Sequence, residues 1–116
     1  NIASDWGLRG GERAAAYCAS KGGLVLLTKA MARDHAREGL SVNAICPGDV
    51  DAPMLTAEAE AEGMDIDEYM EEASDSVPSG RVAEPEEVAS LALFLASDAA
   101  AHINGTTIAI DGAGGA

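Results

Sequence analysis

Tyr17 and Lys21 are the residues of this chain whose types and spacing most directly suggest chemistry. They stand four positions apart, so on a helix they share one face, one turn from each other. A lysine ammonium held close to a phenol favours the phenolate and lowers the tyrosine pKa from its ordinary value of about 10. Tyr17 could then exchange a proton with a substrate oxygen near neutral pH, and the hydroxyl of Ser4 could hold that oxygen. Taken alone, most pairs of this kind are solvated surface neighbours.

Several separately placed motifs surround the pair and make the chemical interpretation more specific. In chain order they are Ser4, Tyr17–Lys21, Val42–Gly48, Arg81–Ser97 and Asp111–Gly112. In this combination the chain resembles the short-chain dehydrogenase/reductase family, over nearly its whole length from Asn1 to Gly112. The resemblance implies an oxidoreductase that interconverts an alcohol and a ketone or aldehyde by hydride transfer with NAD or NADP.

The resemblance also implies roles for individual residues. Tyr17 is implied to be the general acid/base, Lys21 to lower its pKa while binding the nicotinamide ribose, and Ser4 to orient the substrate oxygen. The expected partners are a small-molecule alcohol or carbonyl substrate and further copies of the protein in a homotetramer. Two alternatives stay open. A dehydratase or epimerase on the same fold would reuse the tyrosine and lysine, and a non-catalytic fragment or assembly module would need neither.

The implied fold is α/β, with a doubly wound, Rossmann-like parallel sheet. A chain of 116 residues suffices for one small domain but not two, and residues 1–116 are expected to form the C-terminal portion of a single domain. No glycine-rich nucleotide loop is recognisable, because Gly7, Gly10 and Gly11 follow no complete strand. The first three residues instead predict the tail of a strand. We therefore expect the nucleotide-loop half to lie outside this sequence, which leaves NAD and NADP undecided and the chain inactive by itself.

Hydrophobic patterning and helix-end signals predict the remaining elements. They are a helix over 15–38, a buried strand over 40–46, a helix that opens at Pro85 and a strand over 106–110. The stripe of Leu24, Leu27 and Met31 supports the first helix, and Gly39 marks its end.

The segment after the first buried strand is the candidate cofactor contact. Ligands of doubly wound sheets bind outside the carboxyl ends of the strands, where Pro47 and Gly48 lie. The resemblance implies that Pro47, Gly48 and Val50 contact the nicotinamide end, with the Val50 backbone facing the carboxamide. The alternative is a plain turn, since Pro-Gly pairs are common in turns. Ala52 stands where many family members carry a cofactor-binding threonine, so we expect a weaker hold at that point.

Residues 54–78 are expected to cap the substrate with two short helices, split near Gly63. The resemblance implies that this insertion varies with the substrate, and a lid suits a reaction that must exclude water. Met54 is the candidate substrate-contacting residue of this segment. The alternative is that its methionines only pack a small core.

The charge of the chain excludes several kinds of partner. With 7 basic and 20 acidic residues the net charge is −13, which argues against nucleic acid and anionic membranes as partners. No apolar run approaches the ~20 residues of a membrane span, so a cytoplasmic protein is expected. Twelve acidic residues and no basic ones separate Arg37 from Arg81. This acidic stretch predicts either a solvated face, as in proteins of a high-salt cytoplasm, or attraction of a cationic substrate.

Cys18 and Cys46 lack metal-binding spacing and are expected to be small buried thiols. No metal site is therefore expected.

Overall fold

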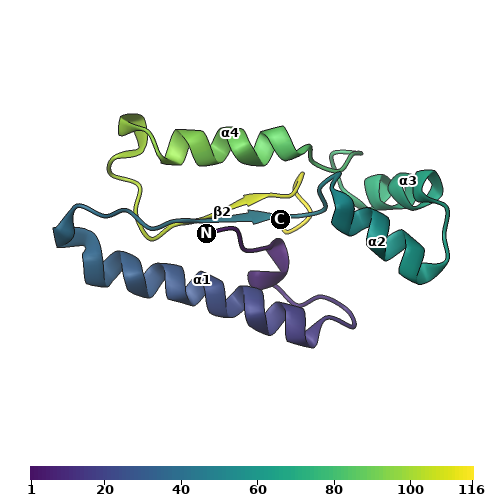
Figure 1. Cartoon of the computed structure of the whole chain (residues 1–116), viewed down its shortest axis with the longest axis horizontal. Coiled ribbons are helices and arrows are strands. Elements are labelled where there is room, and N and C mark those ends of the chain that lie inside the picture. Colours follow the sequence, from purple (N-terminus) through teal and green to yellow (C-terminus); the bar gives the residue numbers. More distant parts are fainter.

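Two short parallel strands lie between a long helix and a second helix in the computed structural model, which describes all residues from Asn1 to Ala116. Strand β1 (Ala44–Pro47) pairs with β2 (Thr107–Ile110), with Ala44 opposite Thr107 and Pro47 opposite Ile110. Helix α1 (Ala15–His35) covers one face of the sheet and α4 (Pro85–Leu95) covers the other (Figure 1). This is the layering of a partial Rossmann-like α/β fold, as the sequence predicted.

The first residues of the chain add a strand-like segment at the other edge of β1. Ile2 forms a parallel bridge with Ile45, which pairs with β2 on its opposite side. The Ala3 N–H donates to the Ile45 carbonyl at 2.8 Å, and the Ile45 N–H donates to the Asn1 carbonyl at 2.9 Å. The expected strand tail is therefore confirmed, and the local order across the sheet is Asn1–Ala3, β1, β2.

Strand β1 is fully buried but shorter than the predicted 40–46 segment. Before Ala44 the backbone carbonyls still accept main-chain bonds, from the Gly105 N–H to Val42 and from the N-terminal amine to Asn43, at 2.9 Å each. Side-chain amides provide the other bonds of this segment. The Val42 N–H donates to Asn104 Oδ1 at 2.8 Å, and the side chain of Asn43 bridges the Ile103 carbonyl and the Thr106 N–H. This mixture of main-chain and side-chain bonds interrupts the ladder, so regular pairing begins only at Ala44.

Helix α1 matches its predicted range closely. It continues after His35 into a 3-10 turn, η2 (Ala36–Glu38), and ends at Gly39, whose φ of 77° is the left-handed conformation that glycine adopts without strain. The side of α1 that packs on the sheet carries Val25, Thr28 and Ala32. Leu27 of the predicted apolar stripe is half exposed, so the stripe identified the helix but not the face that it buries.

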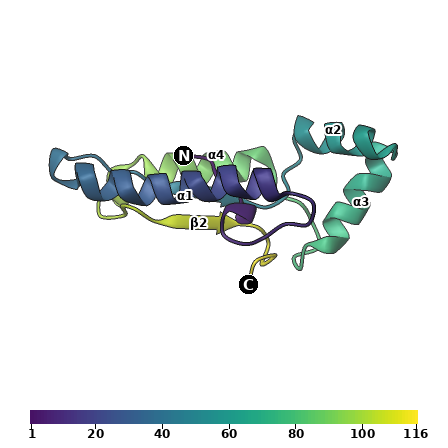
Figure 2. The same cartoon turned by 90° about the horizontal axis from the view of Figure 1, so that it is seen from below.

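Helices α2 (Pro53–Glu62) and α3 (Ile66–Ser76) project together from one end of the layered part (Figures 1 and 2). Gly63, at φ 70°, separates them, which confirms the predicted split. The Tyr69 hydroxyl donates to Glu58 Oε2 at 3.2 Å and joins the two helices. Burial and the charge of Glu58 raise the pKa of Tyr69 to about 12, so its hydroxyl keeps the proton that this bond uses.

Helix α4 begins with a network of charged side chains. The carboxylate of Glu87 accepts hydrogen bonds from the Glu84 N–H at 2.8 Å and from both terminal nitrogens of Arg81 at 2.7 Å each. Further along the helix, Leu93 is 75% exposed and Phe94 44% exposed, so α4 carries more apolar surface than its sheet contact uses. None of the helices combines the length and the apolar character that crossing a bilayer needs.

Candidate active site

Ser4 lies where the Asn1–Ala3 segment ends and the 3-10 helix η1 (Asp5–Gly7) begins. It is the N-cap of η1, and its Oγ accepts a hydrogen bond from the Trp6 N–H at 3.2 Å. Only 7% of Ser4 is exposed. The residue is therefore held at the carboxyl end of a strand-like segment, the edge at which ligands of doubly wound sheets bind.

Tyr17 and Lys21 lie one turn apart in the first half of α1. The Lys21 Nζ is 5.7 Å from the centroid of the Tyr17 ring, so the expected shared face is present. The same Nζ donates to the main-chain carbonyl of Ile2 at 3.1 Å. This bond ties the ammonium to the segment that leads into Ser4. The Tyr17 hydroxyl makes no hydrogen bond within the chain, so it is available to a ligand.

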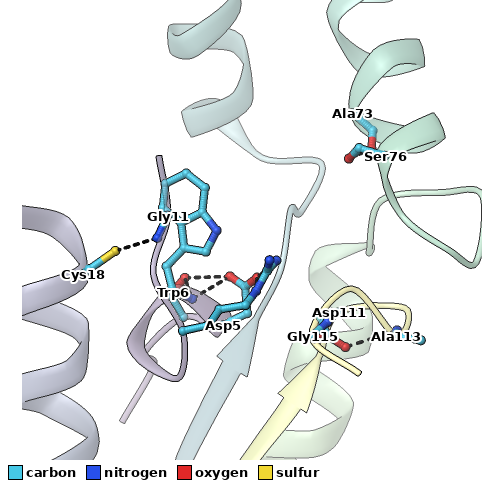
Figure 3. Close-up of polar contacts among 11 residues, drawn as sticks. Asp5, Trp6, Gly11, Cys18, Ala73, Ser76, Asp111, Ala113 and Gly115 are labelled. Carbon is cyan, nitrogen blue, oxygen red and sulfur yellow. Dashed lines mark hydrogen bonds and ion pairs between the residues drawn. The ribbon is translucent and has the colours of Figure 1, made fainter. Parts of the chain in front are cut away.

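Trp6 is a neighbour of Tyr17 that the sequence analysis did not identify. The two rings meet edge to face, with centroids 6.0 Å apart and planes at 82°. Gly11 lies so close to the indole that a Cβ at this position would collide with it, and the Gly11 N–H donates to Cys18 Sγ at 3.3 Å (Figure 3). The loop before α1 thus presses Trp6 onto the tyrosine. The one signal in the sequence was a single tryptophan two residues after Ser4.

Asp5 and Arg9 form a second feature beside Ser4 that was not predicted. Asp5 is 7% exposed, and its Oδ2 accepts hydrogen bonds from Arg9 Nη2 at 2.6 Å and Arg9 Nε at 3.1 Å. Its Oδ1 accepts from the Ser4 hydroxyl at 3.1 Å. It also accepts from the Trp6 N–H at 2.8 Å, and Figure 3 shows Asp5 beside Trp6. The i, i+4 spacing of an acidic and a basic residue was visible in the sequence, but no regular helix there predicted that they would meet.

The carboxyl end of β1 places the predicted cofactor-contacting residues at the same edge of the sheet as Ser4. Pro47 is the last residue of β1, and the Gly48 N–H donates to the Ile110 carbonyl at 2.9 Å. A Cβ at Gly48 would lie 3.1 Å from the Cβ of Asp111, so a larger residue there would require the two chain segments to move slightly apart.

Val50 presents unused backbone groups at this edge. Its neighbours Asp49 and Asp51 both bond to Ala83, through the Asp49 carbonyl and the Asp51 N–H, at 2.9 Å each. In an extended segment the backbone groups of successive residues point to opposite sides, so those of Val50 face away from Ala83. No bond within the chain uses them. A free N–H and a free carbonyl on one residue match the carboxamide of a nicotinamide, so the residues present fit that group.

Met54 lies in the first turn of α2 and is 60% exposed, but the structure records no contact between it and Tyr17 or Ser4. Two hollows occur elsewhere. One of about 380 Å³ lies beside Asp49, Arg81 and Asp111, and another of about 280 Å³ lies beside Asp5, Arg9 and Asp111. Neither is lined by Tyr17 or Lys21, both of which are half buried.

The two cysteines differ in how far their thiols are buried. Cys46 is completely buried in β1, and burial raises the pKa of its thiol, so it packs as a small neutral group, as expected. Cys18 is half buried, and its sulfur is the acceptor for Gly11.

A comparison with known families decides what this arrangement belongs to. The family model described as "Enoyl-(Acyl carrier protein) reductase" matches residues 1–114. A short-chain type dehydrogenase/reductase of Sinorhizobium fredii is 40% identical over 112 residues, which are 97% of this chain and 20% of that protein. The chain belongs to the short-chain dehydrogenase/reductase family. Within the family, meso-2,3-butanediol dehydrogenase of Serratia marcescens is 44% identical over 97% of this chain and 42% of its own length. The chain thus spans less than half the length of these curated relatives.

Solved structures of the family agree with the fold. The ligand-free aldohexose dehydrogenase of Thermoplasma acidophilum superposes with a TM-score of 0.92 at 38% identity, over 98% of this chain and 46% of that one. The F189W actinorhodin polyketide ketoreductase, solved with NADPH, gives a TM-score of 0.93 at 37% identity, over 99% and 46%.

Proposed function

We propose that the protein containing this chain is an NAD- or NADP-dependent oxidoreductase that interconverts an alcohol and a ketone or aldehyde. The observation that carries the proposal is the stacking of Lys21 and Tyr17 one turn apart, with the lysine nitrogen 5.7 Å from the phenol ring, in a member of the short-chain dehydrogenase/reductase family. The solved relative with NADPH, and another with bound NADP, support the choice of cofactor class.

Each candidate residue has a part in this reaction. Tyr17 gives a proton to the substrate oxygen or takes one from it, and its free hydroxyl is available for that transfer. The ammonium of Lys21 stabilises negative charge on the phenol oxygen and donates to the cofactor ribose. Ser4 holds the substrate oxygen with its Oγ. The nicotinamide, when bound, supplies or accepts the hydride.

The segment after β1 and the two projecting helices complete the proposed site. Pro47 and Gly48 bring the chain to the edge of the sheet, where the free backbone groups of Val50 bind the carboxamide. Residues 54–78, with Met54 at their start, cap the substrate and exclude water.

The exposed apolar side chains on α1 and α4 support the proposed homotetramer, which light scattering on the full-length protein would test. The two free thiols support the proposed cytoplasmic location.

The test is turnover by the full-length protein with NAD⁺ and NADP⁺, followed at the absorbance of the reduced nicotinamide. The alcohol panel comes from the relatives: meso-2,3-butanediol, a 3β-hydroxysteroid and an aldohexose. Tyr17→Phe should abolish turnover without unfolding the protein, whereas Tyr69→Phe, which removes the only other phenol hydroxyl of this chain, should retain more than half of it.

Two outcomes would contradict the proposal. Turnover that survives Tyr17→Phe would reject the assigned role of this residue. Conversion of substrate without net change in nicotinamide absorbance would instead indicate an epimerase that returns its hydride to the substrate.

A further inference from the structure

We propose that Trp6 is a specificity-determining residue whose indole N–H binds a second substrate oxygen, on the carbon next to the reacting one. The substrates that this favours are vicinal diols and α-hydroxy ketones. The inference rests on the proposed function and deepens it, because it narrows the substrate class of the same site. Proton and hydride transfer are unchanged, since the second oxygen only accepts a hydrogen bond and keeps its own proton.

Trp6 is anchored between the two parts of the candidate site. Its main-chain N–H donates to Ser4 Oγ at 3.2 Å and to Asp5 Oδ1 at 2.8 Å, which fixes its backbone in the η1 turn. The next residue, Gly7, packs so closely on α1 that an added Cβ would lie 2.8 Å from the Lys21 carbonyl oxygen. The tryptophan is therefore held beside the serine on one side and beside the lysine on the other.

The indole ring of Trp6 is confined by its neighbours. Tyr17 meets it edge to face, with the ring centroids 6.0 Å apart. Gly11 lies against the ring carbons, where an added Cβ would collide with them. Figure 3 shows Gly11 and the Cys18 thiol on one side of the indole and its nitrogen turned to the other side. A ring confined in this way presents its N–H in a fixed direction, which lowers the cost of binding an oxygen placed there.

The indole N–H of Trp6 has no partner within the chain. Every buried side-chain nitrogen or oxygen of this structure is hydrogen-bonded, so the unpaired nitrogen of this half-buried residue is accessible from outside. A tryptophan N–H can donate but cannot accept, and it carries no charge. Its complement is therefore a neutral oxygen acceptor, such as a hydroxyl or a carbonyl group, and not an ammonium group.

The reacting oxygen of the substrate does not need this donor. In the proposed reaction it is held by Ser4 and exchanges its proton with Tyr17. The contact between the indole and phenol rings limits how far apart their polar groups can lie. The acceptor for Trp6 must therefore be close to the reacting oxygen, and the adjacent carbon of a diol or a hydroxy ketone supplies such an acceptor.

A role in packing alone would have a different signature. If Trp6 only supported Tyr17 and the loop, its replacement would change the turnover of every alcohol by a similar factor. If the N–H binds the second oxygen, its replacement reduces the preference for a diol over the alcohol that lacks one hydroxyl. The ratio of the two kcat/KM values separates these cases, because an effect on packing acts on both substrates of the same variant.

The test measures kcat/KM of the full-length protein for two matched pairs, meso-2,3-butanediol with 2-butanol and cis-1,2-cyclohexanediol with cyclohexanol. We expect the wild type to prefer the diol by about tenfold or more in at least one pair. Trp6→Phe keeps an aromatic ring against Tyr17 but has no N–H, so it should reduce that preference to about twofold or less. Leu8→Ala removes an exposed apolar side chain from the same loop and, as the control, should retain the wild-type preference.

A closer isostere provides a second variant in case Trp6→Phe does not fold. Trp6→benzothienylalanine keeps the shape of the indole with sulfur in place of the N–H, and it should lower the preference as much as Trp6→Phe. Two outcomes would overturn the inference. One is a wild type that prefers neither diol, including one that turns over none of the four alcohols. The other is a preference that survives the replacement of Trp6.

Binding of the second oxygen can be observed without turnover in the Tyr17→Phe variant, loaded with the oxidised nicotinamide. The indole N–H resonance of Trp6, assigned by its loss on further replacement by Trp6→Phe, should shift when the diol is added. It should shift less than half as far with the matched mono-alcohol, and equal shifts would overturn the inference. The inference and the proposed function fail separately. Turnover that survives Tyr17→Phe rejects the function, whereas loss of turnover in Tyr17→Phe together with an unchanged diol preference in Trp6→Phe rejects only the inference.

Discussion

Lys21→Met removes the positive charge beside Tyr17 while keeping most of the length and apolar stem of the side chain. With the 5.7 Å between the Lys21 nitrogen and the centre of the Tyr17 ring taken as the charge separation, two unit charges attract by about 3 kcal/mol at an effective dielectric constant of ~20. The same pair attracts by less than ~1 kcal/mol in bulk water. Lys21 is half exposed, so the interaction lies between these limits. We take about 2 kcal/mol, which corresponds to a loss of roughly thirtyfold in rate.

The assay compares kcat/KM of Lys21→Met with that of Lys29→Met in the full-length protein. Lys29 lies on the same helix, is exposed and is the only other lysine of this chain, so it controls for the loss of a charge from α1. We expect Lys29→Met to change kcat/KM less than twofold. We also expect Lys21→Met to weaken binding of the reduced nicotinamide, measured by fluorescence titration. Equal kcat/KM values for the two variants would refute the electrostatic reasoning.

Three further predictions concern the elements that support the site. Gly48→Ala should lower the free energy of unfolding, measured in urea, by about 1–3 kcal/mol, because its Cβ would lie 3.1 Å from the turn after β2. Gly10→Ala is the control, and since Gly10 has open space around it, this variant should leave the free energy of unfolding unchanged. The hydrogen bond from Arg81 holds the pKa of Glu87 at about 2, below its ordinary 4.5, so the stability that Glu87 adds is complete above pH 4.5 and lost as the pH falls toward 2. Glu87→Gln should therefore lower the melting temperature at pH 7 but not at pH 2, and a difference that persists at pH 2 would contradict this. Ala52→Thr should stabilise α2 by about 1 kcal/mol, since the N-cap of this helix has an extended backbone and no side-chain hydrogen bond, and unchanged urea unfolding would show that the cap does not form.

Local signals were sufficient for most of the helices. Gly39 and Gly63 are left-handed at the ends of η2 and α2, where a residue without a Cβ is favoured, so each boundary could be predicted from one residue. Pro85 opens α4 for a similarly local reason, because its fixed φ and missing N–H suit the first turn.

Features that depend on tertiary contacts could not be predicted in this way. Thr28 faces the sheet although it is polar, because its hydroxyl donates to the Leu24 carbonyl and accepts from the Asn1 amide. No periodic pattern in residues 5–14 indicated that Trp6 would lie against Tyr17 or that Asp5 would reach the Ser4 hydroxyl. The sequence motifs thus located the candidate catalytic residues, whereas the groups that orient them became apparent only from the folded loop.

The partner of the Lys21 ammonium is a main-chain oxygen, the carbonyl of Ile2. Any amino acid at position 2 offers the same oxygen, so point substitutions there would leave the lysine anchored. What the anchor does depend on is the alignment of the first residues against Ile45. Sliding that segment by a single residue would turn the carbonyl toward the opposite side and set the lysine free. The placement of a charged side chain is in this way encoded in how two backbone segments are paired.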